Sequence, residues 1–319
     1  FHKLMQDRAT REQMGEWVCK RLEPDLTAFS PEVARRFRAY HRAEPEGLER
    51  SILRAAHYIA TKWEFSFILH WSADMYGVDQ TRREIDEQIS RIDLPAAREI
   101  LESPADSRLW GFISLVGQLT FQRRWAQTPR IPQTSVLGHL LFVALVSWMV
   151  SHEVGVCPRR LYNNFFGGLF HDIPEVLTRD IISPVKASVE GLDEMIRRYE
   201  REAMEERIFP LLPEGWHREL RWYTEEEFTN KTWQEGQIDP VQRHAGDIPR
   251  ELDRDCYNPM DGHIIEICDK LAAYIEASVS IRTGIRSPAL EEGKRRLYDR
   301  FRQARIEGLS LGYLFEYFR

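Results

Sequence analysis

The sequence has few cysteines, and none of them has the spacing of a metal or redox motif. No two cysteines form a CxxC pair, which excludes a cysteine-rich zinc ribbon and a thioredoxin-like centre. Few cysteines in a chain of 319 residues are typical of a reducing compartment, so we expect a cytoplasmic protein. The four thiols are those of Cys19, Cys157, Cys256 and Cys268.

A long apolar run is also missing. The most apolar window, residues 136–150, contains His139 and is shorter than the roughly 20 residues that a membrane-spanning helix needs. We interpret it as a buried helix of a globular core. The first residues, FHKLMQDRATREQ, lack the apolar segment of a secretion signal. We therefore expect neither membrane association nor secretion.

The chain has no excess of basic residues. Its 44 lysines and arginines are outnumbered by 50 acidic residues, and the formal net charge is −6. Binding to a nucleic-acid polymer depends on many cationic contacts with the phosphate backbone, so we do not expect such a partner. A small phosphorylated substrate remains compatible with this charge, because a few local arginines are enough to bind one phosphate group.

Strand patterns are absent as well: no segment shows convincing apolar–polar alternation, and there is no Asn-Gly hairpin turn. Instead, apolar residues recur at three- and four-residue spacing, which predicts helices and an all-α fold. The predicted helices cover residues 8–21, 31–42, 48–76, 80–92, 94–101, 108–124, 134–152, 158–171, 192–209, 261–282 and 288–318. Residues 210–255 are expected to form short helices and loops.

The dipeptide His171-Asp172 is the most informative motif, because its imidazole and carboxylate can reach the same metal ion. His139 on an upstream apolar helix and Asp269 on a downstream one complete a candidate ligand set. Two imidazoles and two carboxylates suit one divalent cation such as Mn, Co, Fe, Ni or Zn.

Structural alternatives exist for each candidate ligand taken alone. A histidine on an apolar helix is often hydrogen-bonded to a backbone carbonyl, and Asp269 can form an ion pair with its neighbour Lys270. The occurrence of all the candidates on three apolar helices favours the metal site. A carboxylate on such a helix needs a partner, because burying it unpaired costs several kcal/mol, roughly.

In this order, H…HD…D, the sequence resembles the HD-superfamily metal-dependent phosphohydrolases, and most closely the bacterial 5′-deoxynucleotidases of the YfbR type. The resemblance covers residues 123–280. Its most specific part is the run HDIPEVLTRD from His171 to Asp180, followed by SPVK ending at Lys186. The other two parts are Arg123-Arg124-Trp125 before the His139 helix and DKLAAY from Asp269.

The resemblance implies a role for each of these residues. His139, His171, Asp172 and Asp269 would be metal ligands. Glu175 would orient or deprotonate the attacking water, and we expect it on the same side of a helix as Asp172. Asp180 would act near the scissile phosphate or the sugar 3′-hydroxyl, although it could instead cap a helix.

The substrate-binding residues implied by the resemblance are Arg124, Trp125 and Lys186. Arg124 would bind the phosphate with its guanidinium fork, with Arg123 as the competing candidate. Trp125 would pack on the sugar and disfavour a 2′-hydroxyl, or simply belong to the core. Lys186 matches the family pattern without a defined role.

The resemblance also predicts the domain organisation. Residues 106–319 would form an HD-type phosphohydrolase domain with an inserted segment at about 187–260, and residues 1–105 a helical N-terminal extension. The stretch around residues 217–250 lies between two metal-site elements and could cover the pocket. We expect a homodimer.

Three function hypotheses follow. The first is a phosphomonoesterase acting on (deoxy)nucleoside 5′-monophosphates. The second is another phosphohydrolase of the superfamily: a dNTP triphosphohydrolase, a cyclic-nucleotide phosphodiesterase or a (p)ppGpp hydrolase. The last of these usually has a further acidic residue where Val176 stands. The third is a catalytically idle HD domain that serves as a regulatory or ligand-binding module.

Overall fold

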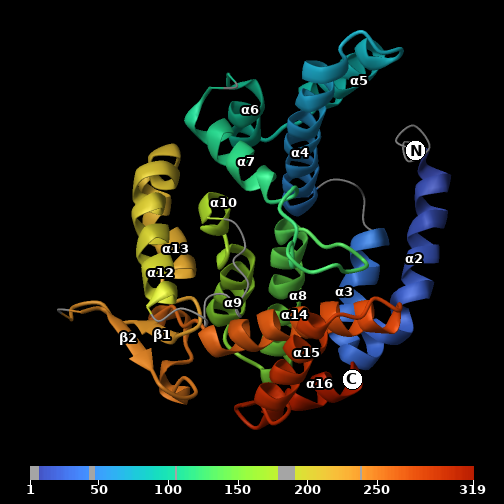
Figure 1. The fold of residues 1–319 in the computed structure, drawn as a ribbon. Helices are drawn as coiled ribbons and strands as arrows, with labels where there is room; N and C mark the ends of the chain where they lie inside the picture. The colour runs from blue at the N-terminus through green and yellow to red at the C-terminus, as the bar shows by residue number, and fades with distance from the viewer. Residues whose placement is uncertain (1–6, 43–46, 105, 179–190, 238) are drawn as a thin grey trace. The chain divides into compact units, whose positions relative to one another are not determined.

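The computed structural model describes residues 7–42, 47–104, 106–178, 191–237 and 239–319 (Figure 1). The chain divides into two compact units, Phe1–Glu102 and Ser103–Arg319. Most of the described residues are helical, which confirms the all-α expectation. Asp180 and Lys186 lie outside the described residues.

The first unit consists of helices. They are α2 (Arg8–Phe29), α3 (Pro31–Arg42), α4 (Leu48–Ser72), α5 (Val78–Ser90) and α6 (Pro95–Glu102). Helix α4 packs against α5 and α6. A small core between them contains Ala55, Tyr58, Ile92, Ala97 and Leu101.

The second unit begins with α7 (Arg108–Gln118), and its core is made by four longer helices. These are α8 (Val136–Val154), α9 (Pro158–Phe170), α14 (Gly262–Arg282) and α15 (Pro288–Phe301). Helices α8 and α9 lie side by side, and α14 packs against α8, α9 and α15 (Figure 1). Ile264, Ile265 and Leu271 of α14 belong to the buried cluster at the centre of this unit.

Helix α8 is long and apolar enough to cross a membrane by length and composition alone, yet 44% of its most apolar window is buried within the protein. The core helix of a globular protein passes the same test. Ser135 caps the start of α8 by accepting a hydrogen bond from the Gly138 amide, and Gly155 ends it in the left-handed conformation. The helix therefore presents His139 at a fixed position near its capped N-terminus.

The segment between α9 and α14 contains shorter elements. They are α10 (Glu175–Thr178), α12 (Leu192–Ala203), a π-helical turn (Met204–Ile208), a 3-10 turn (Phe209–Leu211), α13 (Glu214–Thr224), β1 (Asn230–Trp233), β2 (Val241–His244) and two further 3-10 turns (Arg250–Leu252 and Asp255–Tyr257). Strands β1 and β2 form an antiparallel hairpin. No pattern in the sequence predicted this hairpin.

Several predicted helices are shorter than expected, among them α4, which ends at Ser72, and α12, which ends at Ala203. Helix α7 ends at Gln118 rather than near residue 124, because the backbone of Arg124 donates a hydrogen bond to Thr134 instead of continuing the helix. The predicted helix over residues 288–318 is interrupted by the hairpin of β3 (Arg305–Ile306) and β4 (Leu309–Ser310) and resumes as α16 (Gly312–Tyr317).

Candidate functional site

The candidate ligands come from three helices that pack together. His139 lies in the first turns of α8, His171 is the C-terminal cap of α9, and Asp269 lies in the middle of α14. The helices α8 and α9 can approach closely because Gly168 has no side chain: a Cβ atom there would lie 3.0 Å from the Cα of Ala144. This contact brings the two histidines from different helices to one place, with ring centroids 5.7 Å apart.

The structure brings all four predicted ligands together. One potential ligand atom from each of His139, His171, Asp172 and Asp269 lies within 4.8 Å of the others. The Nε2 atom of His139 is 3.1 Å from Asp269 Oδ1, and Nε2 of His171 is 3.2 Å from Asp172 Oδ2. His139 and His171 are each 3% exposed and Asp269 is 5% exposed. The four side chains could therefore hold one metal ion.

The hydrogen bonds of His171 fit the role of a ligand. Its Nδ1 lies 2.9 Å from the carbonyl oxygen of Gly168, so this nitrogen carries the proton and Nε2 presents a lone pair. The Nε2 atoms of both histidines are buried without a hydrogen-bond partner among the residues that the structure describes. Buried polar atoms rarely stay without a partner. The two Nε2 nitrogens are therefore well suited to bind a cation between them.

Electrostatics inside the cluster couple its members. Burial opposes a charged His171, but the neighbouring Asp172 carboxylate outweighs burial and raises the pKa of His171 to about 9. The pKa of Asp172 is lowered in turn, because the charge of His171 outweighs the effect of burial. Burial and the nearby Arg124 lower the pKa of His139. A bound cation would take the place of the His171 proton, because a ligating imidazole must be deprotonated.

Asp269 forms an ion pair with Lys270. The sequence had suggested this ion pair as an alternative to a role as metal ligand. Lys270 Nζ lies 2.7 Å from Asp269 Oδ2. Burial raises the pKa of Asp269, but Lys270 and His139 outweigh it, and the pKa is well below its usual range. The ion pair uses Oδ2, while Oδ1 faces His139, so the two roles are compatible.

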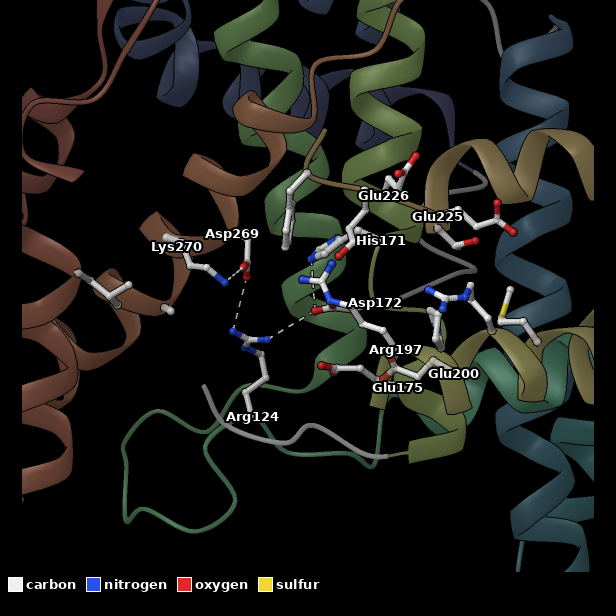
Figure 2. A pocket seen from close by; sticks show the side chains of 18 of the residues that line it. Arg124, His171, Asp172, Glu175, Arg197, Glu200, Glu225, Glu226, Asp269 and Lys270 are labelled. Atoms are coloured by element: carbon white, nitrogen blue, oxygen red, sulfur yellow. Dashed lines mark hydrogen bonds and ion pairs between the residues drawn. The ribbon is translucent and has the colours of Figure 1, made fainter. Parts of the chain in front are cut away.

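Arg124 lies close to both ligand carboxylates. Its guanidinium nitrogens lie 3.8 Å from Asp172 and 3.8 Å from Asp269, and Figure 2 shows it between these two side chains. Arg123, the competing candidate, is exposed and lies beside a separate hollow of about 300 Å³. The geometry therefore favours Arg124 as the arginine that can reach a phosphate beside the cluster.

Trp125 is held by α14 and α15. Its indole Nε1 donates a hydrogen bond of 3.0 Å to Glu276, which also lies 3.5 Å from Arg124 Nε. The edge of the ring lies 3.2 Å from where a Cβ of Gly293 would be, so the ring packs tightly against α15 at this glycine. Trp125 is half-buried and lines the pocket, so the ring is available for a substrate contact.

The cluster opens into a pocket of about 880 Å³. Glu175 and Asp172 both line it, although the chain between them turns instead of forming the continuous helix that we expected. The turn is closed by a hydrogen bond of 3.0 Å from the Glu175 amide to the Asp172 carbonyl. Glu175 is 8% exposed and lines this pocket.

The segment between α12 and β2 supplies much of the pocket wall. Arg197, Glu200 and Arg201 of α12 line it, together with Glu225, Glu226, Glu227, Phe228 and Arg243. The ring of Phe228 lies 5.9 Å from that of His171, and Lys270 Nζ lies 5.4 Å from the Phe228 ring. Part of the stretch around residues 217–250 thus lines the pocket, and that it covers the pocket stays a prediction.

Several residues that line the pocket or contact its lining were not predicted from the sequence. Glu276 follows Asp269 by seven residues and so lies on the same face of α14, which is the signal that could have pointed to it. Glu227 and Arg197 carry no such signal, because they lie on segments whose position relative to the cluster depends on packing alone.

Comparisons with known proteins identify the family of the second unit. A family model described as an HD domain matches residues 116–298, which is more than half of the 319 residues. A crystal structure of an HD-domain phosphohydrolase from Listeria innocua is similar, with 19% identity and a TM-score of 0.45, over 65% of this chain and 83% of that chain. No curated protein matches the chain significantly.

The chain belongs to the HD-domain family. This membership, with the ligand cluster, supports the coarser expectation of a metal-dependent phosphohydrolase. The finer resemblance to 5′-deoxynucleotidases stays a prediction, as do the homodimer and the cytoplasmic location.

Proposed function

We propose that the protein is a metal-dependent phosphomonoesterase that acts on (deoxy)nucleoside 5′-monophosphates. The observation that carries this proposal is the cluster of His139, His171, Asp172 and Asp269 at one side of a pocket of about 880 Å³. A pocket of this size is large enough for a nucleotide, since small-molecule sites measure roughly 300–1,000 Å³.

The four ligands would hold a divalent cation, which supplies Lewis-acid activation of a water and of a phosphoryl oxygen. Arg124 binds the phosphate, because its guanidinium can donate to two oxygens at once. Lys270 adds a second positive charge on the same side of the cluster. Together the two side chains stabilise the charge that develops on the phosphoryl oxygens.

Glu175 serves as the base that orients the attacking water and accepts its proton. The carboxylate lies in the pocket wall three residues after Asp172, and general-base catalysis of this kind contributes roughly 10²–10⁴-fold. Trp125, fixed by Glu276, packs against the sugar. Asp180 would assist near the scissile phosphate or the 3′-hydroxyl and Lys186 would bind substrate; both assignments come from the motif alone.

A dNTP triphosphohydrolase is the second candidate. It is favoured by further arginines that line the same pocket, namely Arg197, Arg201, Arg296 and Arg300. Such residues could bind the additional phosphates of a triphosphate. The two candidates differ in their products, because a monoesterase releases inorganic phosphate and a triphosphohydrolase releases tripolyphosphate.

The test incubates the purified full chain with Mn or Co and a panel of dNMPs, NMPs and dNTPs, and identifies the released anion by ion chromatography. We expect inorganic phosphate from the monophosphates. Tripolyphosphate from the triphosphates would instead support the second candidate. Bound metal without release of any anion would indicate an idle, ligand-binding HD domain and contradict the proposal.

Two variants separate the metal site from the catalytic base. Asp269→Ala should lose both bound metal and activity, because it removes a ligand. Glu175→Gln should keep the metal, measured by elemental analysis, and lose turnover by roughly 10²–10⁴-fold. A fully active Glu175→Gln protein would remove Glu175 from the mechanism.

A further inference from the structure

Three successive glutamates, Glu225, Glu226 and Glu227, line the pocket, but they differ in their partners. Glu225 lies 3.6 Å from Arg221, and Glu226 lies 2.8 Å from Arg243. Glu227 forms no ion pair with any side chain in the described part of the chain. Its carboxyl group is thus the one of the three that has no cationic partner at contact distance.

The position of Glu227 is fixed by the backbone around it. The Thr229 amide donates a hydrogen bond of 2.9 Å to the Glu226 carbonyl, so Glu227 is the second residue of a closed turn. This turn rests directly on the start of α14: a Cβ on Gly262 would lie 2.1 Å from backbone atoms of Phe228 and Thr229. The next residue, Phe228, packs against the His171 ring. Glu227 is therefore held at the edge of the metal cluster.

The environment of Glu227 is unfavourable for an isolated carboxylate. Burial raises the pKa of Glu227, and a hydrogen bond from its own backbone amide together with the charge of Arg197 offsets this effect only in part. Burying a carboxylate that has no cationic partner is unfavourable in free energy. An acid in this situation is typical of a group that meets a ligand.

The distribution of charge in the pocket indicates which part of a ligand Glu227 can contact. Arg124 and Lys270 lie beside the cluster and attract the phosphate (Figure 2). A carboxyl group repels a phosphate, so Glu227 suits the part of the ligand that carries hydrogen-bond donors. In a nucleotide these donors are the sugar hydroxyls and the amino groups of the base.

We infer that Glu227 is a specificity-determining residue, which accepts a hydrogen bond from a hydroxyl or amino group of the nucleoside part of the substrate. The inference rests on the proposed function, because it takes the substrate to be a phosphorylated compound bound at the cluster. The inference adds a direct contact between the turn of residues 226–229 and the non-phosphate part of that substrate.

The test compares the wild type with Glu227→Ala and Glu227→Gln on deoxynucleoside monophosphates and on phenyl phosphate, which has no hydroxyl or amino donor. We expect Glu227→Ala to lower kcat/KM for the nucleotides roughly 10- to 100-fold, the effect of losing a hydrogen bond to a charged group. Hydrolysis of phenyl phosphate should be unchanged. Glu227→Gln keeps an acceptor oxygen and should lie between wild type and Glu227→Ala.

Glu235→Gln is the matched control, because this exposed glutamate of the β1–β2 hairpin does not line the pocket. It should behave as wild type on both substrates. Equal losses on nucleotides and phenyl phosphate in Glu227→Ala would overturn the inference, and so would full nucleotide activity.

Failure of the proposed function has a different outcome. If the wild type hydrolyses none of these compounds, calorimetric binding of deoxynucleosides and their monophosphates to the wild type and Glu227→Ala decides the matter. Weaker binding to Glu227→Ala supports the inference. Equal binding, or no binding to either protein, overturns it.

Discussion

The carboxylate of Glu276 accepts a hydrogen bond from the indole of Trp125 over 3.0 Å. The same carboxylate lies 3.5 Å from Arg124 Nε and contacts the Thr134 hydroxyl. Glu276 therefore connects two of the predicted substrate-binding residues, Arg124 and Trp125, to α14, the helix that also carries Asp269. The residues proposed to bind phosphate and one of the proposed metal ligands are thus connected through the same helix.

Glu276→Gln should weaken substrate binding without loss of metal. The amide can still contact Trp125 but no longer holds the Arg124 guanidinium by charge, so we expect KM to rise by roughly tenfold, the effect of one charge-assisted hydrogen bond. Steady-state kinetics and elemental analysis measure the two quantities. Glu291→Gln, an exposed change on α15, serves as control. An unchanged KM would show that Arg124 needs no such anchor.

Arg160 should be essential for the stability of the second unit. It is 0% exposed and binds Asp261, the cap of α14, through two hydrogen bonds of 2.6 and 2.9 Å. Arg160→Met would leave that carboxylate buried without its partner, which costs about 3–5 kcal/mol. Urea unfolding measures the loss, and the exposed Arg159→Met is the control. A similar midpoint for both variants would contradict this role.

Lys231 should make stability depend on pH in the alkaline range. Burial lowers the pKa of Lys231 from its ordinary 10.5 to about 8. Between these values the unfolded chain binds the proton and the folded protein does not, so stability rises with pH. The shift corresponds to about 3 kcal/mol.

Other groups also titrate in this range, so the comparison is with Lys231→Met. The free energy of unfolding of the wild type, relative to that of the variant, should increase from pH 8 to pH 10.5. Denaturant unfolding at several pH values measures it. A constant difference between the two proteins would show that Lys231 stays protonated.

Gly262→Ala should disturb both stability and the pocket. The added methyl group would meet backbone atoms at 2.1 Å, so the turn of residues 226–229 must shift. We expect a loss of about 1–3 kcal/mol, as for other overpacked sites, together with lower activity. In the control, Gly215→Ala on α13, the new methyl group meets nothing within 4 Å. If Gly262→Ala is as stable as this control, the backbone at Gly262 does not pack closely against Phe228 and Thr229.

Much of the fold was predictable because helices are determined locally. The apolar spacing in the sequence predicted α3 with its observed bounds, Pro31–Arg42, and placed the cores of α8 and α14. The hairpin of β1 and β2 was missed, since its strands are short and lack a standard turn dipeptide. The early end of α7 was missed because Arg124 pairs its backbone with Thr134.

The sequence by itself determined the ligand types and the helices that carry them, because His171 and Asp172 are adjacent and apolar periodicity marks the helices of His139 and Asp269. Only the tertiary structure decided that these side chains meet, that Arg124 and not Arg123 faces them, that Glu227 lines the pocket, and that Glu276 holds Trp125. The reason is physical: a helix forms through hydrogen bonds between residues four apart, whereas the pocket depends on packing between segments a hundred residues apart.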